Sequence, residues 1–186
     1  MYKMIPWSPK MDLSKFYDTA KQKGFLNNSS QKTMIDCFNN EREKQIWILF
    51  CGDEPIGSVA SHTLDIIGPN AYRILSRNCV IIEAVGRRGM LTRNNGIKKH
   101  QNFTDQFFIP TCIEWAGRDK DLYITSNQSP IASQRLVHNI YCPTHAESGI
   151  LENTGSREYR GTIQTFWKLN VERFYKSLNE HPHWTN

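Results

Sequence analysis

The sequence predicts a single α/β domain with a mixed sheet. Three observations favour this fold class: apolar runs of strand length, apolar residues at helical spacing between those runs, and the absence of any repeat or low-complexity tract across the 186 residues. This length fits one domain, because domains usually hold about 100–200 residues. We therefore expect one domain over residues 1–186, with a polar tail from about residue 178.

The N-terminal part is predicted to be mainly helical. A short strand is expected near residues 2–7. Apolar residues at helical spacing predict a helix from Met11 to Gly24, where the glycine ends it. Asn28 to Ser30 offer a cap for a second helix that runs through Phe38.

Three strands are predicted next, and the first two form a hairpin. The apolar run Ile46 to Cys51 is typical of a buried strand, the residues Gly52 to Pro55 form a turn, and the chain returns over Ile56 to Leu64. After the turn at Gly68 to Asn70, a third strand is predicted from Tyr72 to Glu83, bent within its length.

The rest of the chain alternates between helices and strands. A helix is predicted from about Thr104 to Ala116, in which Pro110 either bends the helix or marks its first turn. A short strand follows at Leu122 to Thr125, and a further helix from Ser133 to about Ala146 is shortened by Pro143.

The C-terminal region is predicted to hold two paired strands. Apolar and polar residues alternate from Ile163 to Glu172, which predicts a half-buried strand that pairs with one near Glu158 to Arg160. The complete order is therefore (β)ααβββαβαββ.

The positive charge is concentrated in one segment. The net charge is +5, and the segment between Arg73 and His100 contains seven basic residues and a single acid, Glu83. The basic residues are Arg73, Arg77, Arg87, Arg88, Arg93, Lys98 and Lys99. Such a block indicates a polyanionic partner, either a phosphorylated cofactor or nucleic acid, although a solvated loop would carry the same charge.

Several classes of protein are disfavoured. No apolar run reaches the length of about 18 residues that spans a membrane, and the N-terminus lacks the apolar stretch of a signal peptide, so we expect a cytoplasmic protein. The five cysteines lie far apart without a CxxC pair, which favours reduced core residues over disulfides or a metal site.

This order resembles the fold of the GNAT N-acetyltransferase superfamily, and two local matches carry the resemblance further. The residues Gly52 to Ser58 (GDEPIGS) are similar to the family's hairpin turn, and the stretch from Ser126 and Asn127 to Gly149 is similar to its Asn-x-x-Ala…Leu-Tyr…Gly pattern. The pattern also resembles GNAT-like proteins of tailed phages of marine bacteria. The resemblance implies a mostly antiparallel sheet flanked by helices.

The resemblance also implies acetyl-CoA, or another acyl-CoA, bound where two strands splay apart. Its pantetheine arm would pair with the fourth strand around Val80 and Ile82, with its pyrophosphate at the start of the next helix. The family's Arg-x-x-Gly-x-Gly motif is matched only in part, in a segment where a lysine takes the second small position. This segment comprises Arg93, Asn94, Asn95, Gly96 and Lys98. Ser126 and Asn127 would either bond the cofactor or substrate, or cap a helix.

The implied reaction is direct attack of an amine on the thioester carbonyl, which requires a general base and a proton donor. Glu83 is the candidate base; the alternative is a surface carboxylate that neutralises Arg87 or Arg88. Tyr141 and His138 are the candidate donors, and either could instead pack against the sheet.

Three functions follow from these observations. The first is N-acyl transfer to a small amine or to a protein amino group. The second is nucleic-acid binding through residues 73–99, with His100 and Phe103 stacking on bases. The third is a catalytically inactive GNAT-like interaction module, which the incomplete phosphate motif would also fit.

Overall fold

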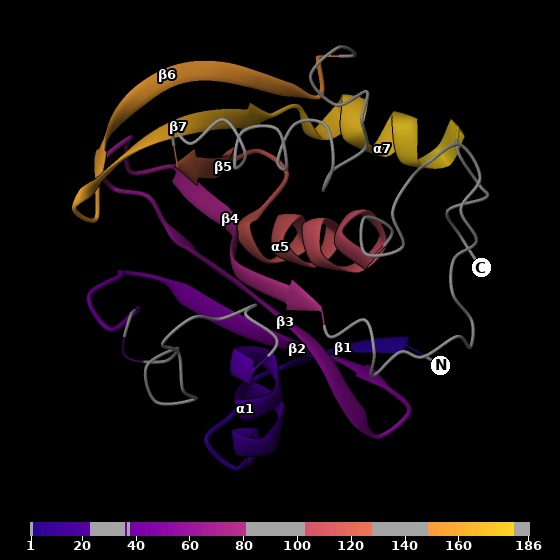
Figure 1. Ribbon diagram of the computed structural model, residues 1–186. Coiled ribbons are helices and arrows are strands. Elements are labelled where there is room, and N and C mark those ends of the chain that lie inside the picture. Colours follow the sequence, from indigo (N-terminus) through magenta and orange to yellow (C-terminus); the bar gives the residue numbers. More distant parts are fainter. Residues whose placement is uncertain (1, 23–35, 37, 81–102, 128–148, 181–186) are drawn as a thin grey trace.

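A seven-stranded sheet forms the centre of the protein (Figure 1). The computed structural model describes residues 2–22, 36, 38–80, 103–127 and 149–180, and of residues 77–80 and 127 it describes the backbone. In sheet order the strands are β1 (Tyr2–Pro6), β2 (Lys44–Cys51), β3 (Glu54–Thr63), β4 (Ala71–Val80), β5 (Asp121–Asn127), β7 (Thr162–Leu169) and β6 (Leu151–Tyr159). Among the described strands only β4 and β5 pair in parallel, which confirms the mixed, mostly antiparallel sheet.

Helices cover both faces of this sheet (Figure 1). Helix α1 (Ser14–Gln22) lies on one face, while the π-helical turn η1 (Thr104–Phe108), α5 (Ile109–Ala116) and α7 (Val171–Glu180) pack on the other. The predicted first helix is thus confirmed. The helix predicted at Asn28 to Phe38 falls largely outside the described residues, and the one predicted at Ser133 to Ala146 falls wholly outside them. No described helix is long and apolar enough to cross a membrane.

The core has two main parts, one on each face, because successive side chains of a strand point to opposite sides. On the α1 side, Ile48 and Ala60 pack against Phe16. On the α5 side, Leu49 and Ile74 join the larger cluster, which α5 and α7 cover. Burial on both faces explains why β2 reads as a continuous apolar run instead of an alternating one, and why the polar residues of β3, among them Ser58 and His62, are buried as well.

Strand β4 is irregular, in agreement with the bend predicted within it. The residue pairs Ala60↔Ser76 and His62↔Arg73 enclose one residue of β3 but two of β4, so β4 carries an extra residue there. Leu75, in this bulge, has a φ of 57° although it is not a glycine. A bulge of this kind bends the strand and increases its twist.

Pro110 marks the first turn of α5, the second of the two predicted outcomes. The wider π-helical turn η1 precedes it, and the Ile109 N–H donates to the carbonyl of Thr104. Because proline has no N–H, it is tolerated at the start of a helix, where that group would have no partner in the preceding turn.

The prediction for the C-terminus was wrong in part. The strand pairing of β6 with β7 is confirmed, but β7 ends at Leu169 and does not continue to Glu172. Asn170 ends the strand and caps α7, because its Oδ1 accepts the N–H of Arg173 at 2.9 Å. The helix buries Phe174 and continues through Leu178 to Glu180.

Replacing the cap should weaken α7 without touching the core. We expect Asn170→Ala to lower the free energy of unfolding by about 1 kcal/mol, the usual value for a lost N-cap. Urea unfolding followed by circular dichroism measures it. Asn170→Ser is the matched control and should stay close to the parent, since serine also caps helices. Equal stability of the alanine and serine variants would contradict the assigned cap.

Candidate functional site

The parting of β4 from β5 is the main irregularity of the sheet. The two strands pair over three residues only, Ala71↔Asp121 to Arg73↔Tyr123. Beyond these pairs, β4 stays bonded to β3 and β5 stays bonded to β7. Within the described residues, the facing edges of β4 and β5 therefore form no ladder with each other after Arg73 and Tyr123. Their backbone N–H and C=O groups there need other partners.

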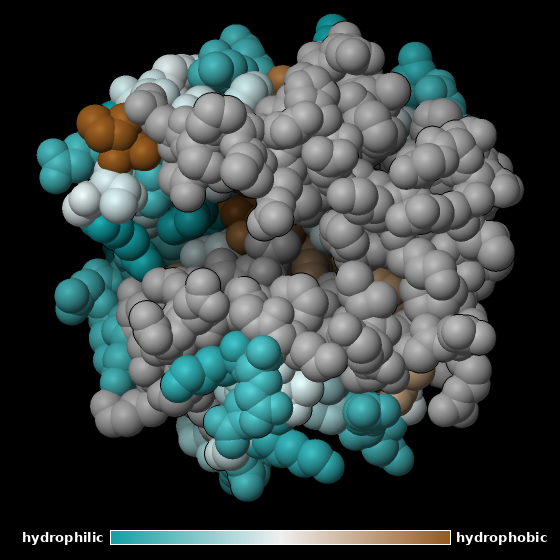
Figure 2. Space-filling model, viewed as in Figure 1, coloured by the Kyte–Doolittle hydropathy of each residue, from teal (hydrophilic) through white to brown (hydrophobic). Residues whose placement is uncertain are grey.

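The bulge in β4 lies directly after the last parallel pair. Arg73 is the final residue of β4 that pairs with β5, and Ile74 and Leu75 are the two residues opposite Ser61. The Ser61 hydroxyl donates to the Arg73 carbonyl at 2.9 Å. The bend in β4 thus starts at the point where the two strands separate. In Figure 2, apolar atoms are visible in brown near the middle of this face of the molecule.

Strand β5 brings two hydroxyl groups to the separated edge. Ser126 is buried on the α5 side, and its Oγ accepts the indole N–H of Trp167 at 3.1 Å. The Ser126 hydroxyl keeps its own hydrogen for a further partner. Thr125 pairs with Phe166 and so points to the opposite face, and its buried Oγ1 has no hydrogen-bond partner within the described residues. Sequence analysis selected Ser126 and missed Thr125, whose burial depends on the tertiary packing.

The helix that crosses from β4 to β5 begins with a buried acid. Asp105 lies in the first turn of η1 and is 1% exposed. Burial raises the pKa of its carboxyl well above the usual value, so the neutral form is favoured. Asp105 was also missed, because a lone acid in a helical segment normally lies on the solvated side.

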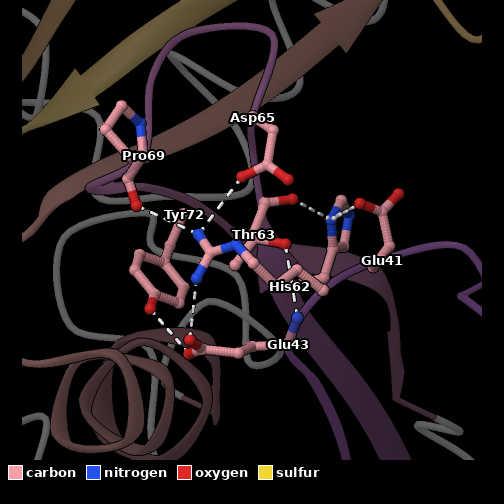
Figure 3. A network of polar contacts seen from close by, with 8 residues as sticks. Glu41, Glu43, His62, Thr63, Asp65, Pro69 and Tyr72 are labelled. Carbon is pink, nitrogen blue, oxygen red and sulfur yellow. Dashed lines mark hydrogen bonds and ion pairs between the residues drawn. The ribbon is translucent and has the colours of Figure 1, made fainter.

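On the α1 face, His62 is a neutral core residue. Its side chain is fully buried, and its Nδ1–H donates to the Thr63 carbonyl at 2.8 Å (Figure 3). Burial is the main cause that lowers the pKa of His62 to about 3, with smaller contributions from Arg73 and Arg160. Glu41 Oε2 lies 3.6 Å from Nδ1, but desolvation outweighs this contact and the imidazole carries no charge near neutral pH.

A polar network holds the closed end of the strand pair. The Tyr72 hydroxyl donates to Glu43 at 2.7 Å, and Arg42 binds both Asp65 and the Pro69 carbonyl (Figure 3). These residues come from the start of β2, the turn after β3 and the start of β4. They fix the end of the sheet at which β4 and β5 remain paired.

Most of the predicted site residues lie outside the described residues. The structure places the Ser126 side chain and the backbones of Val80 and Asn127. Outside the description are Ile82, Glu83, Arg93, Asn94, Asn95, Gly96, Lys98, His138 and Tyr141. Within the described residues, no group of three or more acidic, histidine or cysteine side chains is placed to hold a metal ion.

The prediction that Phe103 stacks on nucleic-acid bases was wrong. Phe103 is 1% exposed, and its ring centroid lies 5.1 Å from that of Tyr2 and 6.1 Å from that of Phe107. The ring is part of the core beside η1 and has no free face. Arg73 is likewise engaged, with its guanidinium 5.4 Å from the Tyr159 ring.

A pocket lined by described residues lies at the end of the sheet where β4 and β5 remain paired. It measures about 550 Å³, at the C-terminal end of α5 and the start of α7. Its lining includes four basic residues, Arg118, Lys120, Lys168 and Arg173, and two acids, Glu152 and Glu172. Arg118 pairs with Glu114, and Lys168 pairs with Asp121 at 2.6 Å.

The fold is similar to solved GNAT acetyltransferases. An aminoglycoside acetyltransferase in complex with coenzyme A and kanamycin has a TM-score of 0.59 and 10% identity, over 96% of this chain and 99% of that one. A GNAT acetyltransferase from Elizabethkingia anophelis with acetyl-CoA bound has a TM-score of 0.51 and 13% identity, over 91% and 98%. The Salmonella typhimurium enzyme that modifies the N-terminal serine of ribosomal protein L7/L12 has a TM-score of 0.54 and 13% identity, over 91% and 95%.

No family model and no curated protein matches the sequence. At these identities the structural likeness concerns the fold, and it confirms the GNAT-like α/β architecture over nearly the whole chain.

The neutral state of His62 makes stability depend on pH. The pKa of His62 is about 3 in the folded state and 6.5 in the unfolded state. The contribution of the neutral imidazole to the free energy of unfolding is therefore complete above pH 6.5 and is lost as the pH falls toward 3. We expect His62→Asn, which keeps an N–H for Thr63, to remove about 1.4 kcal/mol per pH unit of this dependence. Urea unfolding of both proteins between pH 4 and 7 measures it. Parallel stability curves would show that His62 is not buried in its neutral form.

Proposed function

We propose that this protein is an acyl-CoA-dependent N-acyltransferase that transfers an acyl group, acetyl as the first candidate, to an amine. The observation that carries the proposal is the parting of β4 and β5 after Arg73 and Tyr123. Solved proteins of the same fold hold acetyl-CoA or coenzyme A. The unpaired strand edges fit such a molecule, because its pantetheine arm contains two amide groups that can bond to a strand as another strand would.

The cofactor would follow the free edge of β4 toward its C-terminal end. In this proposal the backbone of Val80 and Ile82 pairs with the pantetheine amides. The segment from Arg93 to Lys98, with Asn94, Asn95 and Gly96, holds the pyrophosphate through backbone N–H groups and positive charge. Ser126 supports it from β5, where its hydroxyl accepts the Trp167 N–H and has its own hydrogen to donate. Asn127 follows on the same strand.

The chemistry is one acyl transfer. The amine nitrogen forms a bond to the thioester carbonyl carbon, the carbon–sulfur bond breaks, and the thiolate of coenzyme A leaves. Glu83 is proposed to take the proton that the amine loses, and Tyr141 or His138 to supply one to the thiolate. Because the sheet is open between β4 and β5, the thioester and the amine can approach from opposite faces of the sheet.

The proposed acceptor is a primary amine, either on a small molecule or on a protein. Two proteins of similar fold support this range: one forms a complex with kanamycin, and another modifies the N-terminal serine of a ribosomal protein. The buried and ring-bound positions of Phe103 and Arg73 give no support to the alternative of nucleic-acid binding.

Cofactor binding is the first test. Isothermal titration calorimetry should detect acetyl-CoA and coenzyme A with a dissociation constant in the micromolar range, and Arg93→Ala should weaken binding about tenfold by removing a phosphate contact. Arg118→Ala is the matched control, because Arg118 is exposed and pairs with Glu114 at the far end of α5. A short single-stranded oligonucleotide serves as the comparison ligand. Salt-sensitive binding of the oligonucleotide without binding of coenzyme A would rule out the enzyme.

The proposed base has a separate test. Glu83→Gln should lower kcat by about 10²–10⁴-fold, the usual contribution of general-base catalysis, and leave the dissociation constant of acetyl-CoA unchanged. Release of coenzyme A in the presence of a panel of small amines and peptides provides the assay. Glu54→Gln, at the exposed start of β3, is the control and should retain full activity. Full activity of Glu83→Gln would remove Glu83 from the mechanism.

A further inference from the structure

Three arginines surround two neighbouring aromatic rings on the α1-side face of the sheet. The guanidinium of Arg73, from β4, lies 5.4 Å from the Tyr159 ring centroid, and that of Arg160, from the β6–β7 turn, lies at the same distance from this ring. The guanidinium of Arg157, from β6, lies 5.4 Å from the centroid of Phe166, which is 5.9 Å from that of Tyr159. We call Arg73, Arg157 and Arg160 the arginine cluster.

The arginine cluster lies beside the opening between β4 and β5. Arg73 is the last residue of β4 that pairs with β5, where it lies opposite Tyr123. Thr125 follows Tyr123 on the same face of β5, two residues or about 7 Å farther along the strand. Thr125 pairs in turn with Phe166, the residue whose ring Arg157 contacts. The cluster and the first unpaired part of β5 therefore share one face of the sheet.

Positive charge exceeds negative charge in the described part of this cluster. Arg160 forms an ion pair with Glu41, whereas Arg157 is exposed and forms no ion pair with a described residue. Burial is the main cause of the low pKa of His62, and the charges of Arg73 and Arg160 lower this pKa further. A guanidinium that lies over a ring keeps its N–H donors in its own plane, where a carboxylate can bind two of them. Arg157 thus has donors for a carboxylate, as Arg160 has for Glu41.

Two buried hydroxyl groups lie on the same face. Neither the Tyr159 hydroxyl nor Thr125 Oγ1 has a hydrogen-bond partner within the described residues. Buried polar groups are nearly always paired in proteins, so these two hydroxyls indicate a requirement for a polar group nearby. Guanidinium groups together with hydroxyl donors are typical of a site for an oxyanion.

We propose that the arginine cluster is a subsite for a carboxylate carried by the amine acceptor, so that the preferred acceptor is an amine with an acidic group. The carboxylate binds to Arg157 on the α1 side, and the amine at the other end of the acceptor then points toward the separated strands. The role in acceptor choice rests on the proposed function, whereas the binding of a carboxylate does not.

Binding of the carboxylate can be measured without acyl transfer. The probes are γ-aminobutyrate and its amide, γ-aminobutyramide, which differ in the charge of one end. The Nε–Hε signals of arginines in NMR spectra report on each guanidinium. We expect γ-aminobutyrate to shift the signal of Arg157 and the amide to leave it unchanged. Arg118 is the internal control, because its guanidinium also lies over a ring, that of Tyr175 at 4.6 Å, but on the α5 side.

Acyl transfer provides the second measurement. With acetyl-CoA, the parent protein should have a higher kcat/KM for γ-aminobutyrate than for the amide. Arg157→Gln should lower the ratio of the two about tenfold, mainly through KM, because it removes a charge-assisted hydrogen bond. Arg157→Lys should give an intermediate ratio, since lysine keeps the charge and loses the planar pair of donors. Arg118→Gln is the matched control and should keep the parent ratio.

Three results would overturn the proposal. An Arg157 signal that does not respond to γ-aminobutyrate, or responds equally to the amide, would show that no carboxylate binds there. An unchanged ratio in Arg157→Gln would show that the cluster does not select the acceptor. A tenfold higher dissociation constant for coenzyme A in Arg157→Gln would assign the cluster to the phosphates of the cofactor.

The same experiments separate this proposal from the proposed function. If the parent protein binds no coenzyme A while γ-aminobutyrate still shifts the Arg157 signal, the acyltransferase function is refuted and the carboxylate site remains.

Discussion

The single parallel pairing in the sheet is the constraint on which the rest of the structure depends. Parallel strands cannot be joined by a tight turn, so the chain between β4 and β5 must cross over one face, and η1 and α5 lie on that crossover. The outer edge of β4 is occupied by β3 and that of β5 by β7. β4 and β5 can therefore separate only along the edges that face each other, so the opening lies between these two strands, inside the sheet.

One end of this strand pair is held and the other is released. At the held end, the bond from the Tyr72 hydroxyl to Glu43 links the start of β4 to the segment just before β2. Beyond it, the bulge at Leu75 redirects β4. Hydrogen bonds that satisfy buried polar groups stabilise one arrangement over its competitors, since leaving such groups unpaired is costly.

The proposed recognition of the cofactor through backbone groups would fit a fold that persists at 10–14% identity. A ligand that pairs with a strand edge uses N–H and C=O groups, which every residue except proline supplies in full. The residues along that edge are then free to vary, provided that the bulge and the crossover helix remain. Side chains decide which acceptor binds and how protons are transferred. Proteins of one fold therefore differ in function through the side chains of their sites.

The sequence by itself determined the strands from Ile46 to Leu64, the first helix and the pairing of the last two strands, because apolar periodicity and turn residues are local. It also contained a signal for α7, since Val171, Phe174 and Leu178 follow helical spacing after Asn170. However, the apolar–polar alternation of β7 continues into the first residues of α7, so the sequence does not show where the strand ends. Ser126 lies at the separated edge, and its role in binding stays a prediction. Its bond to Trp167, the burial of Asp105 and the enclosure of Phe103 could not be read from neighbouring residues.

Only the tertiary structure decided where β4 bends and which groups hold it. Ser61 of β3 lies opposite the two extra-register residues of β4, and its hydroxyl donates to the Arg73 carbonyl. Glu41 and Arg160 are also far apart in the chain, and their ion pair brings the β6–β7 turn to the segment before β2. A left-handed leucine has no signature in a sequence, because the residue itself disfavours that conformation. Local periodicity selects the elements, whereas long-range contacts decide where two of them separate, and that separation is the candidate site.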